Sequence, residues 1–453
     1  MNETAQRSAR IETIAMGLLL VFFMLVAALV FWTIVRAPAL MQRGDNPRVV
    51  EAELRILRGR IIDADGVVLA ETVGSDDALQ RHYPIASIGP AVGYYSFRHG
   101  TSGVEQGYDN VLRGGSEATW DALWSRALHR SQIGQDVRLT LDADWQAAAE
   151  ALMGDRTGAL VILSVPDGAV KVMVSHPGYD PNQLDEQFVE LTANSSAPLL
   201  NRVTQGRYQP GLALQPFVLA SVVDRGLVRM DEQVDNAGAP LAVRDQLSGC
   251  RETPPDEATW STVLQYACPA PMVSLIEYLN TAALTQAYER FGLYSQPDFP
   301  MQTADSTPPP VAEARNAILG QESLTVTPLQ MARAWASLAS GGLLPTPYLV
   351  SEVQNEAGVW LPPDRLEVEM QEAVDDSAAS SIMAGLAQYG DTILEHSVAA
   401  LSGPQAAITG WYLGFTPARS PQYAVVVVIE GAADAAAAQE IGRSALRLMP
   451  APE

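Results

Sequence analysis

The segment RYQPGLALQPF, residues 207–217, has the character of a loop that opens a helix bearing a catalytic nucleophile. Tyr208, Pro210 and Gly211 suit the loop, because proline and glycine interrupt regular structure. The positions where chemistry would be expected are Leu212 and Gln215. A leucine side chain has no lone pair with which to attack a carbonyl, and an uncharged amide is not a base near neutral pH. The spacing therefore suits nucleophilic catalysis, but the residue types do not.

Other residues with distinctive chemistry are few. Lys171 is the one lysine, and Gly168 lies three residues before it, so the chain has no Ser-x-x-Lys pair. In such a pair, a lysine one helical turn later accepts the proton of the serine. The histidines lack metal-ligand spacing, and no P-loop or GxGxxG motif is present. We therefore predict no metal site and no cofactor. The five histidines are His82, His99, His129, His176 and His396.

The composition is that of a folded, acidic protein. The 453 residues are enough for two or three domains, and 47% of them are hydrophobic while 18% are charged. The formal net charge is −23 at pH 7. Such a charge repels nucleic-acid phosphates, so we expect no nucleic-acid partner.

An apolar stretch near the N-terminus predicts a membrane anchor. Residues 13–35, TIAMGLLLVFFMLVAALVFWTIV, contain no charge and are long enough to cross a bilayer. A cleaved signal peptide is the alternative, but its apolar region would be shorter and would end in small residues. The sequence instead continues with bulky residues, VFWTIVRAPALMQRGD. We expect a tail at 1–12 and a single transmembrane helix at 13–35, in contact with the lipid bilayer.

The rest of the chain predicts an α+β sandwich. A hairpin is expected early, helices in the middle, and two strands and a helix last, so the sheet would draw strands from both ends of the chain. Pro328 suits a first helical turn and Gly341-Gly342 its end. The expected strands are 54–70 (two, with a turn at Asp65-Gly66), 157–165, 169–177, 407–417 and 421–431, and the expected helical segments are 139–154, 259–293, 326–342 and 434–449.

In this order, the motifs resemble those of the class B penicillin-binding proteins, membrane-anchored D,D-transpeptidases that cross-link peptidoglycan. The resemblance covers nearly everything after the anchor and implies a membrane-proximal, β-rich region at 40–140 before a transpeptidase-like domain at 141–450. In that fold a β-sheet lies between helices. The matching segments are RGRIIDADGVVLA (58–70), GVEQGYDNVLRGG (103–115), SHPGYDPN (175–182), PLLNRVTQGRYQPG (198–211), LGQESLTVTPLQMARAWASLASGG (319–342) and GWYLGFTP (410–417).

The resemblance also shows where the catalytic motifs of the family have changed. The family's SxxK nucleophile motif falls on Leu212 to Gln215. Its SxN motif matches Ala267-Cys268-Pro269 best, and its KTG motif matches Leu401-Ser402-Gly403, where spacing is the guide. The KTG lysine would help to hold the carboxylate of the substrate, which a leucine cannot do. Losing the nucleophile alone costs on the order of a million-fold in a comparable enzyme.

We therefore predict a catalytically dead pseudoenzyme that serves as a structural or regulatory subunit in cell-wall synthesis. One alternative is a noncovalent sensor of peptidoglycan fragments or β-lactams. Another is an active D,D-transpeptidase with an unrecognised nucleophile. An open polar cleft would favour the sensor, whereas closure by Leu212, Leu214 and Leu401 would favour the subunit.

The resemblance further implies a location and a partner. The protein would sit in the cytoplasmic membrane as a single-pass protein, with the bulk of the chain outside, beside a multi-pass cell-wall polymerase and near peptidoglycan. Gly17, Ala27 and Ala28 could offer a close-packing face in the anchor.

Cys250 and Cys268 are the two cysteines of the chain. In an oxidising compartment, a disulfide closing this loop would contribute about 3 kcal/mol. We predict that they pair. The alternative is two free thiols, with Cys268 buried and inert.

Overall fold

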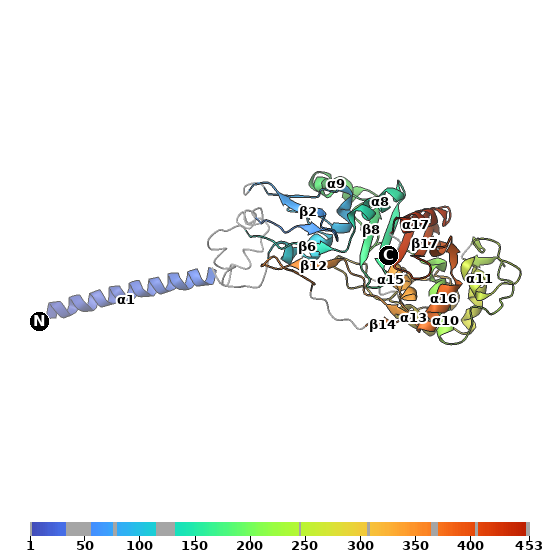
Figure 1. Cartoon of the computed structure of the whole chain (residues 1–453). Coiled ribbons are helices and arrows are strands. Elements are labelled where there is room, and N and C mark those ends of the chain that lie inside the picture. Colours follow the sequence, from blue (N-terminus) through green and yellow to red (C-terminus); the bar gives the residue numbers. More distant parts are fainter. Residues whose placement is uncertain are drawn as a thin grey trace.

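The structure is a computed structural model, shown in Figure 1. It describes residues 2–32, 56–75, 79–114, 132–243, 246–305, 309–363, 370–403 and 406–449, with side chains from residue 14 onward. Parts of the predicted anchor (33–35) and of the predicted membrane-proximal region (40–55) lie outside these ranges.

The N-terminal helix α1 runs over Asn2–Val30. Within the described ranges, no helix is both long and apolar enough to cross a membrane. The single transmembrane helix predicted at 13–35 is therefore not supported by the structure.

A six-stranded sheet follows, in the order β13-β12-β6-β1-β2-β3. The two strands predicted within 54–70 are β1 (Ile61–Ile62) and β2 (Val68–Val73), which pair antiparallel across a turn. In this turn Asp63 Oδ1 accepts hydrogen bonds from the amides of Asp65 and Val67. Two of the strands, β12 and β13, come from far later in the chain, so this sheet is built from both sides of the predicted boundary at 140. The other strands are β3 (Gln80–His82), β6 (Val137–Leu139), β12 (Val350–Gln354) and β13 (Trp360–Leu361).

A buried ionic cluster packs against this sheet. Glu105, on the short helix α5 (Gly103–Gly107), is fully buried and accepts hydrogen bonds from Arg58 at 2.8 Å and Arg81 at 2.6 Å. Burial raises the pKa of Glu105, but the positive charges of Arg81 and Arg58 outweigh burial, so the net shift of the pKa is downward from 4.5. The carboxylate is therefore held ionised between two guanidinium groups.

The second six-stranded sheet has the order β15-β16-β17-β18-β7-β8. As the sequence predicts, it joins strands from the two ends of the domain, and β18 pairs antiparallel with β7. Alternate residues of β7 and β18 enter two different hydrophobic cores, so both faces are buried. The strands are β7 (Gly158–Ser164), β8 (Val170–His176), β15 (Ala387–Tyr389), β16 (Ile393–Ser402), β17 (Ala407–Thr416) and β18 (Tyr423–Glu430).

Helices cover both faces of this sheet. On one face lie α8 (Ala143–Met153), capped by the Asp142 side chain, and α17 (Ala436–Leu448). On the other face lies α15 (Pro328–Ala339), which begins with a Thr327/Gln330 capping box. The Trp335 ring of α15 stacks on Phe415 at 4.4 Å. The predicted α+β architecture, with a sheet between helices, is confirmed.

A helical subdomain completes the molecule, at the end opposite β2 and β6 in Figure 1. The predicted helical segment 259–293 is divided, because Ala267 has a positive φ and Asn280 caps a new helix. Its members are α10 (Gln215–Asp224), α11 (Trp260–Gln265), α12 (Pro269–Ser274), α13 (Thr281–Arg290), α14 (Ala314–Ile318) and α16 (Asp376–Gly385). Shorter elements are α4 (Gly89–Val92), β4 (Tyr95–Ser96), β5 (Gly100–Thr101), α6 (Asp109–Leu112), α9 (Leu184–Ala193), β9 (Leu241–Val243), β10 (Gln246–Ser248), β11 (Leu343–Leu344) and β14 (Gln371–Glu372).

Candidate functional site

The 207–214 loop is held in place by backbone contacts. Tyr208 exchanges two backbone hydrogen bonds with Val326, and the Tyr208 hydroxyl donates to Glu430 at 2.7 Å. Gly211 has a φ of +55°, and a Cβ added there would lie 2.6 Å from the Cβ of Ala400. Glycine is therefore required at 211, because a side chain would collide with β16. The loop passes through a 3₁₀ turn, Gly211–Leu214, into α10 at Gln215, so the predicted loop-to-helix transition is present.

Gln215 has a structural role in this arrangement. It is fully buried, and its Nε2 donates to the carbonyl oxygens of Val263 at 3.2 Å and Cys268 at 3.3 Å. Its Oε1 is buried without a hydrogen-bond partner. The side chain at the position of the motif lysine thus joins the first motif segment to the second and is closed off from solvent.

The second motif segment lies directly beside Gln215. Ala267 is buried with a φ of +52°, a conformation that is unfavourable for a residue other than glycine. Cys268 is the N-cap of α12, and Pro269 fills the first helical position, where its missing N–H costs no hydrogen bond. The segment presents an apolar wall in place of a hydroxyl and an amide.

The third motif segment ends β16. Leu401 pairs with Ile408, and Ser402 pairs with Ala407, in the β16–β17 ladder. Gly403 follows with a φ of +69° and is exposed. No cation stands at 401, so the strand end cannot neutralise a carboxylate through that residue.

A hairpin formed by β9 and β10 makes a further wall. The disulfide Cys250–Cys268, the predicted pair, joins the chain just after this hairpin to the second motif segment. Arg251 donates to Ser397 Oγ on β16 at 2.9 Å, and Arg315 donates to the carbonyl of Ala242 at 2.9 Å. The hairpin is therefore attached to three neighbouring segments.

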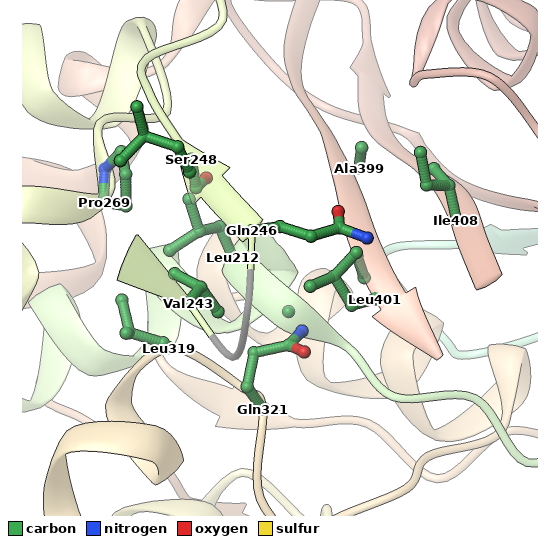
Figure 2. A pocket seen from close by; sticks show the side chains of 13 residues that line it. Leu212, Val243, Gln246, Ser248, Pro269, Leu319, Gln321, Ala399, Leu401 and Ile408 are labelled. Atoms are coloured by element: carbon green, nitrogen blue, oxygen red, sulfur yellow. The ribbon is translucent and has the colours of Figure 1, made fainter. Parts of the chain in front are cut away.

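These segments enclose a small pocket of about 150 Å³, shown in Figure 2. Of the predicted site residues, Leu212, Pro269 and Leu401 line it together. Gln215 and Ala267 are buried and do not line it, and neither do Ser402 and Gly403. Leu214 is fully buried in the core. The three leucines named in the prediction thus do not close the cleft, because a small pocket remains beside Leu212 and Leu401. The other lining residues are Gly211, Val243, Gln246, Leu247, Ser248, Leu319, Gln321, Ala399, Ala400 and Ile408.

His396 lies behind this pocket, and the sequence alone did not single it out. Its Nε2 is 3.0 Å from the carbonyl oxygen of Leu212. Burial lowers the pKa of His396 from 6.5 to about 4, although hydrogen bonding to the backbone of Leu212 and Leu264 opposes the shift. The ring is therefore neutral at pH 7 and joins β16 to the first motif segment. A lone histidine in the apolar run ILEHSVAAL carries no sequence signal for this contact.

The pocket holds no acid–base machinery in the part of the chain that the structure describes. None of its lining side chains is a histidine, a lysine, an arginine or a carboxylate, and the one hydroxyl group belongs to Ser248. A serine needs an adjacent base to become a nucleophile. Across the described residues, no cluster of three or more His, Cys, Asp or Glu side chains is placed to hold a metal ion. The lining can bind by shape and hydrogen bonding.

Two family models match the chain. The penicillin binding protein transpeptidase domain matches residues 158–447, more than half of the chain, and the penicillin binding protein A dimerisation domain matches residues 58–137. The described site residues all fall in the first of these ranges.

Full-length relatives and solved structures agree with these matches. The peptidoglycan D,D-transpeptidase PbpA of Mycolicibacterium smegmatis is 26% identical over 96% of this chain and 98% of its own length. PbpA of Mycobacterium tuberculosis is 28% identical over 88% of this chain and 90% of its own length. A structure of penicillin-binding protein A from M. tuberculosis as a penicillin G acyl-enzyme complex superposes with a TM-score of 0.78. That structure is 26% identical and covers 86% of this chain and 99% of its own.

Proposed function

The chain belongs to the penicillin-binding protein transpeptidase family of peptidoglycan synthesis, and we propose that within it the chain is a structural or regulatory subunit without transpeptidase activity. The observation that carries this proposal is the cleft, where the described lining has Leu212 and Leu401 and no base. Acyl transfer requires an activated nucleophile, and none of these groups supplies one.

The location of the protein is proposed to be the outer side of the cytoplasmic membrane. The Cys250–Cys268 disulfide supports an oxidising compartment, because cytosolic thiols are kept reduced. The helix α1 also leaves large apolar side chains exposed between Ile14 and Val30. Apolar surface of this kind favours contact with a lipid bilayer or another apolar surface.

The partner is proposed to be a multi-pass polymerase of glycan strands, contacted through residues 1–140. Docking through this region needs no Ser-Lys chemistry. The N-terminal sheet region exposes Ile133, with 72% of its surface accessible, whereas the cleft hairpin exposes Leu247, with 75% accessible. These two side chains form a matched pair, similar in type and exposure but in different regions.

The test uses this pair in the cells that make the protein. Ile133→Glu should reduce co-purification of the polymerase with the tagged chain, because a charge placed on a docking surface is repelled or desolvated. Leu247→Glu and Ser402→Ala should leave co-purification unchanged. Quantitative mass spectrometry of the recovered polymerase, normalised to the bait, measures both.

The reverse result would overturn the proposal. If Leu247→Glu or Ser402→Ala impaired function in cells while Ile133→Glu was harmless, the cleft would be the working part. That pattern would favour a ligand sensor or an unrecognised nucleophile.

A further inference from the structure

A large groove lies where the N-terminal region meets the transpeptidase-like domain, apart from the remodelled cleft. Its volume is about 910 Å³, and its described lining shares no residue with that of the cleft pocket. We propose that this groove binds an extended peptide segment of a partner protein through an arginine side chain. The inference does not depend on the loss of transpeptidase activity. The juxtaposition that carries it is two carboxylates and three half-buried aromatic rings in one groove: Asp167, Asp298, Tyr108, Phe299 and Tyr348.

Both matched regions of the chain contribute to the groove. Gly107 and Tyr108 come from the region matched by the dimerisation-domain model, and the other described lining residues come from the transpeptidase domain. A Cβ added to Gly107 would lie 1.8 Å from the carbonyl oxygen of Pro300, so the two regions touch there without room for a side chain. Val350 begins β12 and Ala339 ends α15, two lining elements that are labelled near the centre of Figure 1. The walls are therefore held against each other, and a preorganised site binds with a smaller loss of entropy.

Asp298 supplies a negative charge that can accept a ligand. The residue is exposed, and no hydrogen bond or ion pair joins its carboxylate to another described residue. An ion pair formed beside apolar groups in a groove is stronger than one formed on an open surface, because the effective dielectric constant is lower there. A cation that enters the groove therefore has a carboxylate available.

Asp167 adds a second carboxylate, at the turn between β7 and β8. It accepts hydrogen bonds from the Tyr348 hydroxyl at 2.9 Å and from the Ala169 amide at 3.2 Å, which orient it. Burial raises the pKa of Asp167, but hydrogen bonding and the positive charge of Lys171 outweigh burial, so the net shift of the pKa is downward from 3.8. Asp167 is therefore ionised at neutral pH. Lys171 offsets part of its charge from outside the described lining.

The aromatic rings favour arginine over other cations. Tyr108 and Phe299 pack against the hydrophobic core, and Tyr348 is bonded to Asp167, so all three rings are held in place. A guanidinium group is planar, stacks on aromatic faces and pairs with a carboxylate through two hydrogen bonds. A lysine ammonium is instead a strongly hydrated point charge. An arginine can therefore use the rings and the carboxylates of this groove together.

The size of the groove and its prolines favour a peptide that is read through side chains. The volume of about 910 Å³ is near the upper end of the roughly 300–1,000 Å³ of small-molecule sites, which leaves room for residues on both sides of an arginine. Prolines have no N–H, so they do not offer the donors with which a strand edge pairs with a peptide. Proline-containing segments instead dock on aromatic side chains in other proteins. The lining prolines are Pro166, Pro300, Pro345, Pro347 and Pro421.

The test is isothermal titration calorimetry of the full-length protein with two peptides, acetyl-Pro-Arg-Pro-amide and its citrulline counterpart. Citrulline has nearly the shape of arginine but carries no charge. The arginine peptide should bind about fivefold more tightly than the citrulline peptide. Added salt should weaken binding of the arginine peptide and leave binding of the citrulline peptide unchanged, because salt screens the interaction between charges.

Two variants locate the binding site. Asp298→Asn should reduce the preference for the arginine peptide by roughly threefold, because one of the two carboxylates is lost. Phe299→Leu keeps an apolar side chain but removes the ring, and should reduce the preference by roughly twofold to threefold. Asp256→Asn, at an exposed carboxylate just before α11, is the matched control and should leave the preference unchanged. Thermal melting of each variant separates a loss of binding from a loss of folding.

Three outcomes would overturn the proposal. They are equal binding of the two peptides, binding of neither peptide, and an unchanged preference in folded Asp298→Asn and Phe299→Leu variants. Neither peptide reports on penicillin acylation or on co-purification with a polymerase, so a failure here leaves the proposed subunit role standing.

Discussion

The N-terminal ionic cluster buries paired charges, whereas the described lining of the cleft is uncharged. Around Glu105, a carboxylate and two arginines are buried together, with N–O distances of 2.8 and 2.6 Å. Around Leu212, the lining is aliphatic or amide, and the buried titratable group behind it, His396, is held neutral by desolvation. Burying charge is unfavourable unless each charge is paired and hydrogen-bonded.

This difference separates charges that hold the architecture from charges that would perform a reaction. The Glu105 cluster fixes α5 and the segment before β1 against each other through side chains whose partners all lie inside the protein. A catalytic cleft must leave part of its charge open to a substrate. In this chain the positions predicted for the catalytic motifs hold Gln215, which donates hydrogen bonds to backbone carbonyls, and leucines, which pack against the core.

The largest expected effect comes from breaking the ionic cluster. Glu105→Gln should lower the free energy of unfolding by about 3–5 kcal/mol, because the buried Arg81 then loses its ion pair and Arg58 keeps only its ion pair with Asp109. Urea denaturation followed by circular dichroism measures this. The control is Asp231→Asn, in the exposed Arg229–Asp231 pair, and should not shift the midpoint. Equal midpoints for the two variants would contradict the structural role of the cluster.

The same cluster predicts a dependence on acid. The folded pKa of Glu105 is lowered from 4.5, so the unfolded chain takes up the proton first as the pH falls. Its contribution to stability is complete above about pH 4.5 and is lost as the pH falls through the folded pKa. Glu105→Gln should therefore make unfolding less sensitive to pH below 4.5.

Removing the disulfide beside the cleft is expected to have the next largest effect on stability. Cys250→Ser with Cys268→Ser should lower the free energy of unfolding by about 3 kcal/mol, because the unfolded chain regains the freedom of the closed loop. Counting thiols in the denatured, unreduced protein checks the premise. No free thiol should be found, and a count of two would show that the bond is absent.

Substitution of His396 is expected to have a smaller effect on stability, which is confined to a range of pH. Its folded pKa is about 4 and its ordinary value is 6.5, so between these values the unfolded chain binds more protons. Stability should be complete above pH 6.5 and fall toward pH 4, by up to about 1.4 kcal/mol per pH unit. His396→Gln should flatten this slope. His82→Gln, at an exposed position, should not. An unchanged slope in His396→Gln would show that the ring is not the titrating group.

Much of the transpeptidase-like fold could be predicted because its signals are local. The apolar runs of β7 and β18, the capping residues of α15 and the glycines after it are legible in the sequence. The Cys250–Cys268 disulfide was likewise predictable, since these are the two cysteines of the chain.

The remaining features depend on contacts between distant segments. The pairing of β12 with β6 joins residues near 350 to residues near 138, and no local sequence pattern predicts this pairing. The contact of His396 with Leu212 and the orphaned oxygen of Gln321 likewise arise when separate loops meet. Gln321 lies in a segment that the resemblance had singled out, but an amide there carries no distinguishing signal.

The central claim, that the cleft cannot form an acyl-enzyme, is tested most directly by intact-mass measurement after incubation with penicillin G. Penicillin-binding protein A of M. tuberculosis, whose penicillin G acyl-enzyme structure is known, serves as the positive control. The account predicts that the full chain keeps its unmodified mass, because Leu212 offers no atom that can be acylated. A stoichiometric adduct that maps to one residue, such as Ser248 or Ser402, would contradict it.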